Sequence, residues 1–334
     1  MLANDAVDWH CIHLDQGYEL FHKNDFEGAL VEFEMALAID ERPMARWDRA
    51  LALLALGRYE EGFRDWRTNW QIYNAEITPR AKEWYFYEQR PLWKGERGKR
   101  VTILAEAGYG DMIQMLRFVP FVQQVVPVVL EMPAPMQRLA RQVAPLANDN
   151  DGECILPMFD LPVILRPAPA NLPPPPYLRP DEALSARWAN RTGGRRRIGI
   201  AWSTKFEGDT EHPSARREIP LEKFLGLLPV DGDLYSLQTQ DRERARANGV
   251  HAFAFDDFAD VAALAAVMDI VVSIDTAALH VAGAIGHRAT FAILPYAATW
   301  RWVRGDWYPN IVRCQCASPG NWASAFEKVK CPTL

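Results

Sequence analysis

Residues 269–286 read Asp-Ile-Val-Val-Ser-Ile-Asp-Thr-Ala-Ala-Leu-His-Val-Ala-Gly-Ala-Ile-Gly. The apolar run 270–274 is rich in β-branched residues, which is typical of a buried parallel strand. It stops at Asp275 and Thr276, a pair that favours the start of a helix, and small residues follow. Such a turn brings backbone N–H groups, a hydroxyl and the imidazole of His280 to the carboxyl end of a strand. Open α/β sheets bind phosphates and nucleotides at that edge, so the stretch predicts an α/β fold with a candidate nucleotide site.

Strands and helices alternate on both sides of a proline-rich passage, residues 157–180, which includes four successive prolines. This composition predicts a stiff, extended connection between two domains. The alternation around it predicts two Rossmann-like domains facing a cleft, over 99–180 and 181–334. We expect strands at 100–105, 127–132, 198–202, 234–237, 270–274 and 290–294, and helices at 112–124, 135–143, 220–228, 258–268 and 321–329.

The N-terminal part contains an internal repeat. Residues 24–33, Asn-Asp-Phe-Glu-Gly-Ala-Leu-Val-Glu-Phe, match residues 57–66, Gly-Arg-Tyr-Glu-Glu-Gly-Phe-Arg-Asp-Trp, at an offset of 33 residues. Each unit predicts two helices joined by a turn at Asn24 or Gly57. This region, residues 8–75, resembles the tetratricopeptide repeat, whose period is close to this offset. Its aromatic residues favour a packed core, and a small groove for a protein or peptide partner is the alternative. The aromatic-rich segment 76–98 is expected to be a cap or linker.

Composition and charge exclude several classes of protein. The net charge of −6 arises within residues 1–98, so a general nucleic-acid binder, which would be basic, is disfavoured. The acidic N-terminus does not resemble a signal peptide, and no apolar run reaches membrane-spanning length. The five cysteines are odd in number and scattered, which favours a reduced, cytoplasmic setting and does not predict a zinc site.

Two segments at expected strand ends carry residues suited to chemistry. Gly108-Tyr109-Gly110-Asp111 follows the strand at 100–105, and its glycines allow a ligand to approach the backbone closely. Asp111 is predicted either to cap the following helix or to face the cleft. Trp202-Ser203-Thr204-Lys205, with Arg216 and Arg217, follows the strand at 198–202. Its cations could neutralise a diphosphate leaving group, and the alternative is an ordinary solvated loop.

Taken together, residues 99–330 resemble the bacterial heptosyltransferase-type glycosyltransferases, in the branch fused to tetratricopeptide repeats. The motifs that carry the resemblance are 106–117, 199–203, 217–221, 236–238, 273–280 and 294–309, which includes Trp300-Arg-Trp302. The resemblance implies a GT-B fold, a nucleotide-sugar donor as substrate, and neither a cofactor nor an obligatory metal.

The resemblance also implies roles for single residues. Asp111 matches the position of the general base, beside the cleft loop 108–110. The donor's diphosphate would lie at Asp275, Thr276 and Ala277, where Ala277 stands in place of the family's usual glycine, with His280 close by. Arg217 matches a basic position that holds the donor phosphates. The other residues assigned to the donor cleft are Trp202, Ser203, Lys205 and Gln238.

These observations predict an inverting, metal-independent glycosyltransferase that acts on a protein or a surface glycan. The alternative is a scaffold that binds partners through its repeats and carries a non-catalytic GT-B body. The first Rossmann-like domain is short, which favours the scaffold, whereas the retained Asp111 and Asp275–His280 set favours the enzyme.

Overall fold

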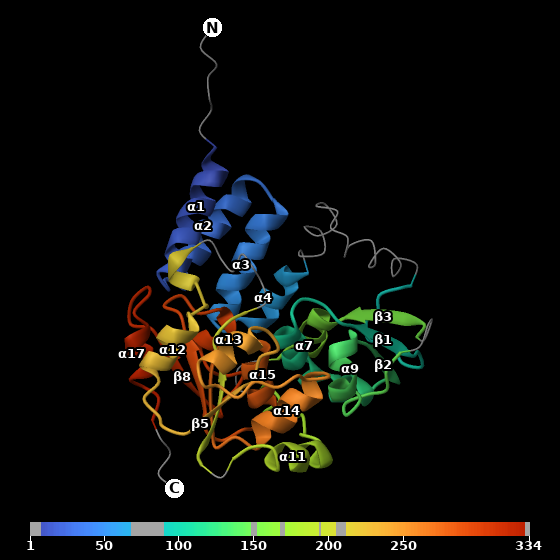
Figure 1. Ribbon diagram of the computed structural model, residues 1–334. Helices are drawn as coiled ribbons and strands as arrows, with labels where there is room; N and C mark the ends of the chain where they lie inside the picture. Colours follow the sequence, from blue (N-terminus) through green and yellow to red (C-terminus); the bar gives the residue numbers. More distant parts are fainter. Residues whose placement is uncertain are drawn as a thin grey trace.

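The computed structural model describes residues 8–67, 90–147, 152–167, 171–193, 195–204 and 212–330. Figure 1 shows the N-terminal helices lying above two α/β units, with a three-stranded sheet in one unit and a five-stranded sheet in the other. No helix of the described residues has the length and apolar character needed to cross a membrane.

The N-terminal region is a stack of helices joined by tight turns: α1 (Trp9–His22), α2 (Phe26–Ile39), α3 (Pro43–Ala55) and α4 (Tyr59–Trp66). The turns within the two helix pairs fall where the repeat predicts them. Asn24 and Gly57, which are equivalent at the offset of 33 residues, both have positive φ, at 64° and 79°. Asparagine and glycine tolerate this left-handed conformation better than other residues. The helices and turns of the repeat are therefore confirmed, and membership of the tetratricopeptide family stays a prediction.

The first α/β unit is built on three parallel strands in the order β2-β1-β3, which are β1 (Val101–Leu104), β2 (Val128–Glu131) and β3 (Cys154–Pro157). The helix expected at 112–124 is divided into α7 (Tyr109–Met115), a 3-10 turn η2 (Leu116–Phe118) and α8 (Val119–Gln123). Pro120 explains the division, because proline lacks an N–H group and its ring clashes with the preceding helical turn. Further along the chain lie α9 (Ala134–Ala140), η3 (Met158–Asp160) and α10 (Leu161–Leu165).

The second unit has five parallel strands in the order β5-β4-β6-β7-β8, which are β4 (Arg197–Ala201), β5 (Asp233–Ser236), β6 (Ile270–Ile274), β7 (Thr290–Leu294) and β8 (Ile311–Gln315). Its helices are α11 (Glu182–Ala189), α12 (Leu221–Leu227), α13 (Arg242–Ala247), α14 (Phe258–Ala266), α15 (Ala277–Ala284), α16 (Trp300–Val303) and α17 (Trp322–Phe326), with a 3-10 turn η5 (Pro213–Ala215). Alternate residues of β6 pack on opposite faces: Val271 shares a core with α14 and α15, and Val272 shares one with α12 and α17. The doubly wound α/β arrangement is thus as predicted.

Two strands were not predicted, and both lie at sheet edges. β3 ends in Pro157, which an edge strand tolerates because a missing N–H need not break a ladder. β8 has the exposed residues Val312 and Arg313 and so lacks the continuous apolar run of a buried strand.

One apolar core joins the N-terminal helices to both α/β units. Trp66 of α4 stacks on Phe159, with ring centroids 4.6 Å apart, and Phe63 packs edge-on against Trp300. The helices therefore share a core with the sheets. The segment 76–98 lies mostly outside the described residues, and the domain boundaries proposed from the sequence stay predictions.

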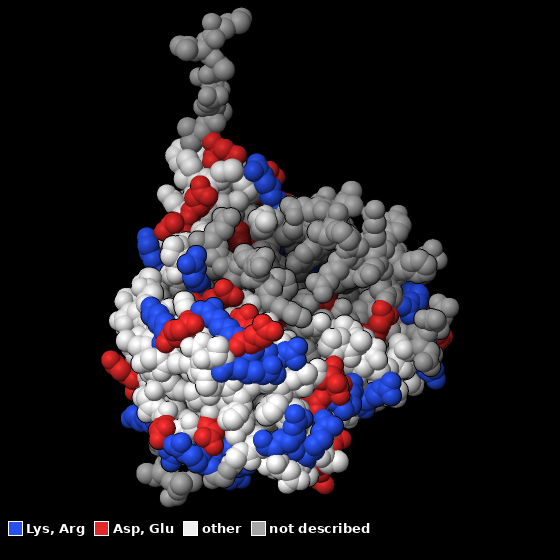
Figure 2. All heavy atoms as spheres, in the orientation of Figure 1, with Lys and Arg blue, Asp and Glu red and all other residues white. Residues whose placement is uncertain are grey.

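Charged side chains on the face shown in Figure 2 are interspersed rather than separated by sign. Ion pairs among the described residues include Arg58 with Glu61 at 2.6 Å and Arg138 with Asp257 at 2.8 Å. The second of these pairs also joins α9 of the first unit to the start of α14 in the second.

Candidate functional site

The topology of the sheets places a pocket between the two units. In the five-stranded sheet the chain leaves β4 for β5 on one side and returns to β6 on the other, so a crevice opens where β4 and β6 end. In the three-stranded sheet, β1 lies in the same way between β2 and β3. The segments that follow β1, β4 and β6 line one pocket of about 600 Å³. It is lined by residues 107–111, 203, 204, 217, 237–240, 255–258, 261, 275–278, 280 and 301, together with Trp47, Trp66 and Pro135.

The start of α15 forms one wall of this pocket. Thr276 occupies the N-cap position, but its side chain makes no capping hydrogen bond and instead lies 3.2 Å from the hydroxyl of Ser273. Ala277 and Ala278 also line the pocket. The first backbone amides of the helix therefore face the pocket without a side-chain cap, and the positive end of the helix dipole favours an anion there.

The side chain of Asp275 forms ion pairs with the basic residues Arg217 and His280 next to this turn. Its carboxylate lies 3.5 Å from Nη1 of Arg217 and 3.6 Å from Nε2 of His280, and it accepts a hydrogen bond of 3.1 Å from Thr299. Burial alone would raise the pKa of Asp275, but the hydrogen bond from His280 and the charges of Arg217, His280 and Arg301 hold it below its usual range. The buried carboxylate is thus charged and satisfied within the protein. Its geometry suits orienting Arg217 and His280 better than touching a ligand directly.

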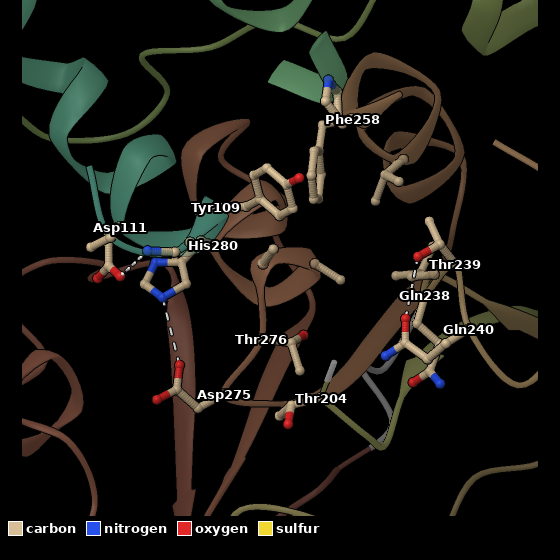
Figure 3. A pocket seen from close by; sticks show the side chains of 18 of the residues that line it. Tyr109, Asp111, Thr204, Gln238, Thr239, Gln240, Phe258, Asp275, Thr276 and His280 are labelled. Carbon is tan, nitrogen blue, oxygen red and sulfur yellow. Dashed lines mark hydrogen bonds and ion pairs between the residues drawn. The ribbon is translucent and has the colours of Figure 1, made fainter. Parts of the chain in front are cut away.

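His280 lies between the two units (Figure 3). One ring nitrogen faces Asp275, and Nδ1 lies 3.0 Å from the hydroxyl of Tyr308. On the other side, Gly110 approaches the imidazole so closely that a Cβ atom at this position would lie 2.6 Å from Cδ2. Gly110 therefore permits α7 to pack against α15, and this contact brings the loop 108–110 next to the turn at Asp275 and Thr276.

The sequence predicted that Asp111 either caps the helix or faces the cleft, and the structure shows a form of both. Asp111 stands at the third position of α7 rather than at the N-cap, which is Gly108, and its Oδ2 accepts a hydrogen bond of 3.0 Å from the Gly108 N–H. Its other oxygen forms an ion pair with Arg301. The side chain is 20% exposed and lines the pocket, so Asp111 both stabilises the helix start and faces the cleft.

The loop after β4 and the residue Gln238 after β5 contribute further polar groups to the pocket. The side-chain oxygen of Gln238 accepts hydrogen bonds from the Trp202 and Ser203 N–H groups at 2.9 and 3.2 Å, and its amide donates to the Ser203 hydroxyl. Ser203, Thr204 and Gln238 line the pocket. Trp202 does not: its indole is buried in the core beneath the sheet, so it supports the loop. Lys205 lies outside the described residues.

Other pocket residues were not assigned from the sequence. Arg301 belongs to the quoted Trp-Arg-Trp segment, yet only the packing of α16 brings it to Asp111. Trp47 and Trp66, whose rings lie 4.2 Å apart, reach the pocket from the N-terminal helices. Phe258 packs on Tyr109 across the two units, with centroids 5.0 Å apart (Figure 3). The aromatic character of the repeat is the signal that could have indicated Trp47 and Trp66.

Within the described part of the chain, no group of three or more His, Cys, Asp or Glu side chains is arranged to hold a metal ion. Among the described residues, the basic side chains that line the pocket are those of Arg217, His280 and Arg301. With the amides of α15, they form a site suited to a phosphorylated ligand.

No family model matches the chain. Over 97% of its length the chain is 25% identical to Protein FlbA of Caulobacter vibrioides, and it spans 61% of that relative. Among solved structures, it is similar to Escherichia coli ADP-heptose lps heptosyltransferase II, with a TM-score of 0.42 and 12% identity over 58% of this chain and 84% of that one. It is also similar to a glycosyl transferase family 9 protein from Veillonella parvula, with a TM-score of 0.49 and 9% identity over 70% of this chain and 96% of that one. Both TM-scores are below 0.5.

Proposed function

We propose that the protein is a glycosyltransferase with a GT-B-like arrangement that takes a nucleotide-sugar as donor. The observation that carries the proposal is the meeting, in one pocket, of an uncapped helix start with Arg217 on one side and the carboxylate of Asp111 on the other. The first group suits a diphosphate, and the second suits removal of a proton from a hydroxyl. The motifs that resemble heptosyltransferases lie at these same positions.

The donor would lie across the pocket from the β4 side to the β1 side. Its diphosphate would bind the first amides of α15 and the guanidinium of Arg217. Its nucleoside would lie toward Thr239, Gln240 and Phe258, where Figure 3 shows amides, a hydroxyl and a ring around the far end of the pocket. The sugar would then lie beside Asp111.

The reaction would be a single displacement at the anomeric carbon. An acceptor hydroxyl forms the new carbon–oxygen bond on the face opposite the phosphate, while the bond to the phosphate oxygen breaks. The hydroxyl proton passes to Asp111, and the electron pair leaves with the diphosphate. Because the hydroxyl attacks the face opposite the leaving group in one displacement, the configuration at the anomeric carbon would be inverted. Arg217 and the helix amides would stabilise the charge on the leaving diphosphate without a metal. The acceptor is proposed to be a protein or a surface glycan.

A second candidate function is a nucleotide-binding scaffold without transfer. The ion pair between Asp111 and Arg301 favours it, because both oxygens of the Asp111 carboxylate already have partners in the protein. The two candidate functions can be told apart by experiment, because a scaffold would bind the nucleotide but would not transfer a sugar.

Thermal unfolding with UDP, GDP and ADP tests the donor site. A ligand that binds only the folded protein raises the melting temperature, so at least one of these diphosphates should do so, and EDTA should not abolish the shift. Asp111→Asn should still bind that nucleotide while losing sugar transfer. If no nucleotide shifts the transition, the donor-site proposal is wrong, and if the variant loses binding, Asp111 is structural.

A further inference from the structure

The ion pair between Asp111 and Arg301 joins the two α/β units across the pocket. Asp111 belongs to α7 of the first unit, and Arg301 belongs to α16 of the second. Their side chains are only 20% and 12% exposed, and both line the pocket. Since Asp111 also accepts the Gly108 N–H, each of its carboxylate oxygens already has a partner. In this arrangement neither oxygen of the proposed base is available to accept a proton from an acceptor hydroxyl.

The position of Arg301 would also allow it to bind an anion other than Asp111. Its Nε donates a hydrogen bond of 3.1 Å to Oε1 of the buried Gln114, and its guanidinium lies 4.3 Å from the ring centroid of Trp300. These contacts anchor the Nε edge and leave Nη2 as the group that holds Asp111. The charge of Arg301 also helps to lower the pKa of Asp275, the residue before the helix start at Thr276. Arg301 therefore lies within electrostatic range of both halves of the pocket.

We propose that Arg301 is a ligand of the donor's diphosphate and, in the absence of donor, a lock on Asp111. This inference rests on the proposed function. A diphosphate carries more negative charge than one carboxylate and offers oxygens that match the guanidinium fork. Donor binding draws Arg301 from Asp111 to the phosphate, and Asp111 is released as a base when the sugar is in place. No bond is made or broken in this step, and only the partner of the guanidinium changes.

The lock predicts that Asp111 opposes nucleotide binding. Asp111→Asn keeps an oxygen for the Gly108 N–H but loses the charge that holds Arg301. This variant should bind the nucleoside diphosphate that most stabilises the native chain about threefold to tenfold more tightly, as expected for release of a partly buried ion pair. Arg301→Gln should bind it more weakly. In Arg301→Gln the additional change Asp111→Asn should give no gain, because no guanidinium remains to be released.

Isothermal titration of the full chain with that nucleotide measures these affinities, and ligand-free melting verifies that each variant is folded. Asp256→Asn is the matched control, since it removes an exposed carboxylate from the same pocket without touching the ion pair. Equal gains in nucleotide affinity in Asp111→Asn and Asp256→Asn would contradict the lock, as would a gain from Asp111→Asn that persists in the Arg301→Gln background. Neither result would contradict the proposed donor site. If the native chain binds none of UDP, GDP or ADP, the proposed function fails, and the lock fails with it.

Discussion

Gly110 lies directly against the imidazole of His280, and a methyl group added there would be 2.6 Å from Cδ2. This contact holds the loop that carries Asp111 against the helix that starts at Thr276. Gly110→Ala should force α7 and α15 apart and lower the free energy of unfolding by about 1–3 kcal/mol, as overpacking does. Nucleotide affinity should fall as well, because both walls of the pocket move.

Gly226→Ala is the control for that variant. Gly226 is also helical, in α12, and a Cβ there would have no atom within 4 Å. The substitution should be neutral or stabilising, by up to about 1 kcal/mol, because alanine favours the helix. Chemical denaturation of both variants measures the difference, and equal stability would contradict the close packing at Gly110.

Arg217→Gln should weaken binding of the nucleoside diphosphate by about tenfold or more, since a hydrogen bond to a charged group is lost. The remaining affinity should depend less on salt concentration, because one cation no longer takes part. Titration at two ionic strengths measures both effects. Arg195→Gln, a change at an exposed arginine paired with Asp231, should bind like the native chain. Unchanged affinity in Arg217→Gln would show that Arg217 does not belong to the proposed donor site.

Glu106 gives the protein a pH dependence near neutrality. Burial raises its pKa to about 8, and the charges of Asp160 and Asp111 add to this, while the hydrogen bond from the Phe159 N–H opposes it. Between the unfolded pKa near 4.5 and this value, the folded chain binds more protons than the unfolded chain. The free energy of unfolding therefore falls as pH rises through this window.

Glu106→Gln should remove that dependence, because an amide does not titrate and its oxygen can keep the Phe159 contact. Relative to the native chain, the variant should gain on the order of 4 kcal/mol between pH 4.5 and pH 8, because the pKa shift spans most of this range. Denaturation at several pH values measures the gain. A constant difference across this range would show that Glu106 titrates normally.

Trp66 tests whether the N-terminal helices are part of the same folded body. Its ring stacks on Phe159 and lies edge-on to Trp300, so Trp66→Ala should cost about 3–5 kcal/mol. Trp9 is 58% exposed, and Trp9→Ala should change stability by less than about 0.5 kcal/mol. Denaturation measures both variants, and a mild effect at Trp66 would indicate loosely attached helices.

Deletion of residues 1–75 extends that test. It would uncover the faces of Phe159, Trp300 and Trp307 that pack on α4, so the truncated chain should bind a hydrophobic dye and aggregate. Dye fluorescence and size-exclusion chromatography measure this. A monomeric, soluble remainder that binds no dye would show that the helices are an independent module.

The sequence predicted the parts of this fold that local patterns determine. The buried strand 270–274 and the turns at Asn24 and Gly57 follow from apolar runs and from residues that tolerate positive φ. β8 was missed because an edge strand needs no continuous apolar run. Arg301 was missed as a site residue because 190 positions separate it from Asp111, and only the packing of α16 brings the two together. Asp275 was interpreted as a ligand, and its burial with Arg217 and His280 could be seen only in three dimensions.

A crystal structure with the stabilising nucleoside diphosphate bound tests the central claim most directly. The account predicts that the diphosphate lies within hydrogen-bond distance of the Ala277 or Ala278 N–H groups and of Arg217, with Arg301 turned from Asp111 toward the phosphate. A nucleotide ordered elsewhere on the protein, or an empty pocket at a saturating concentration, would contradict it.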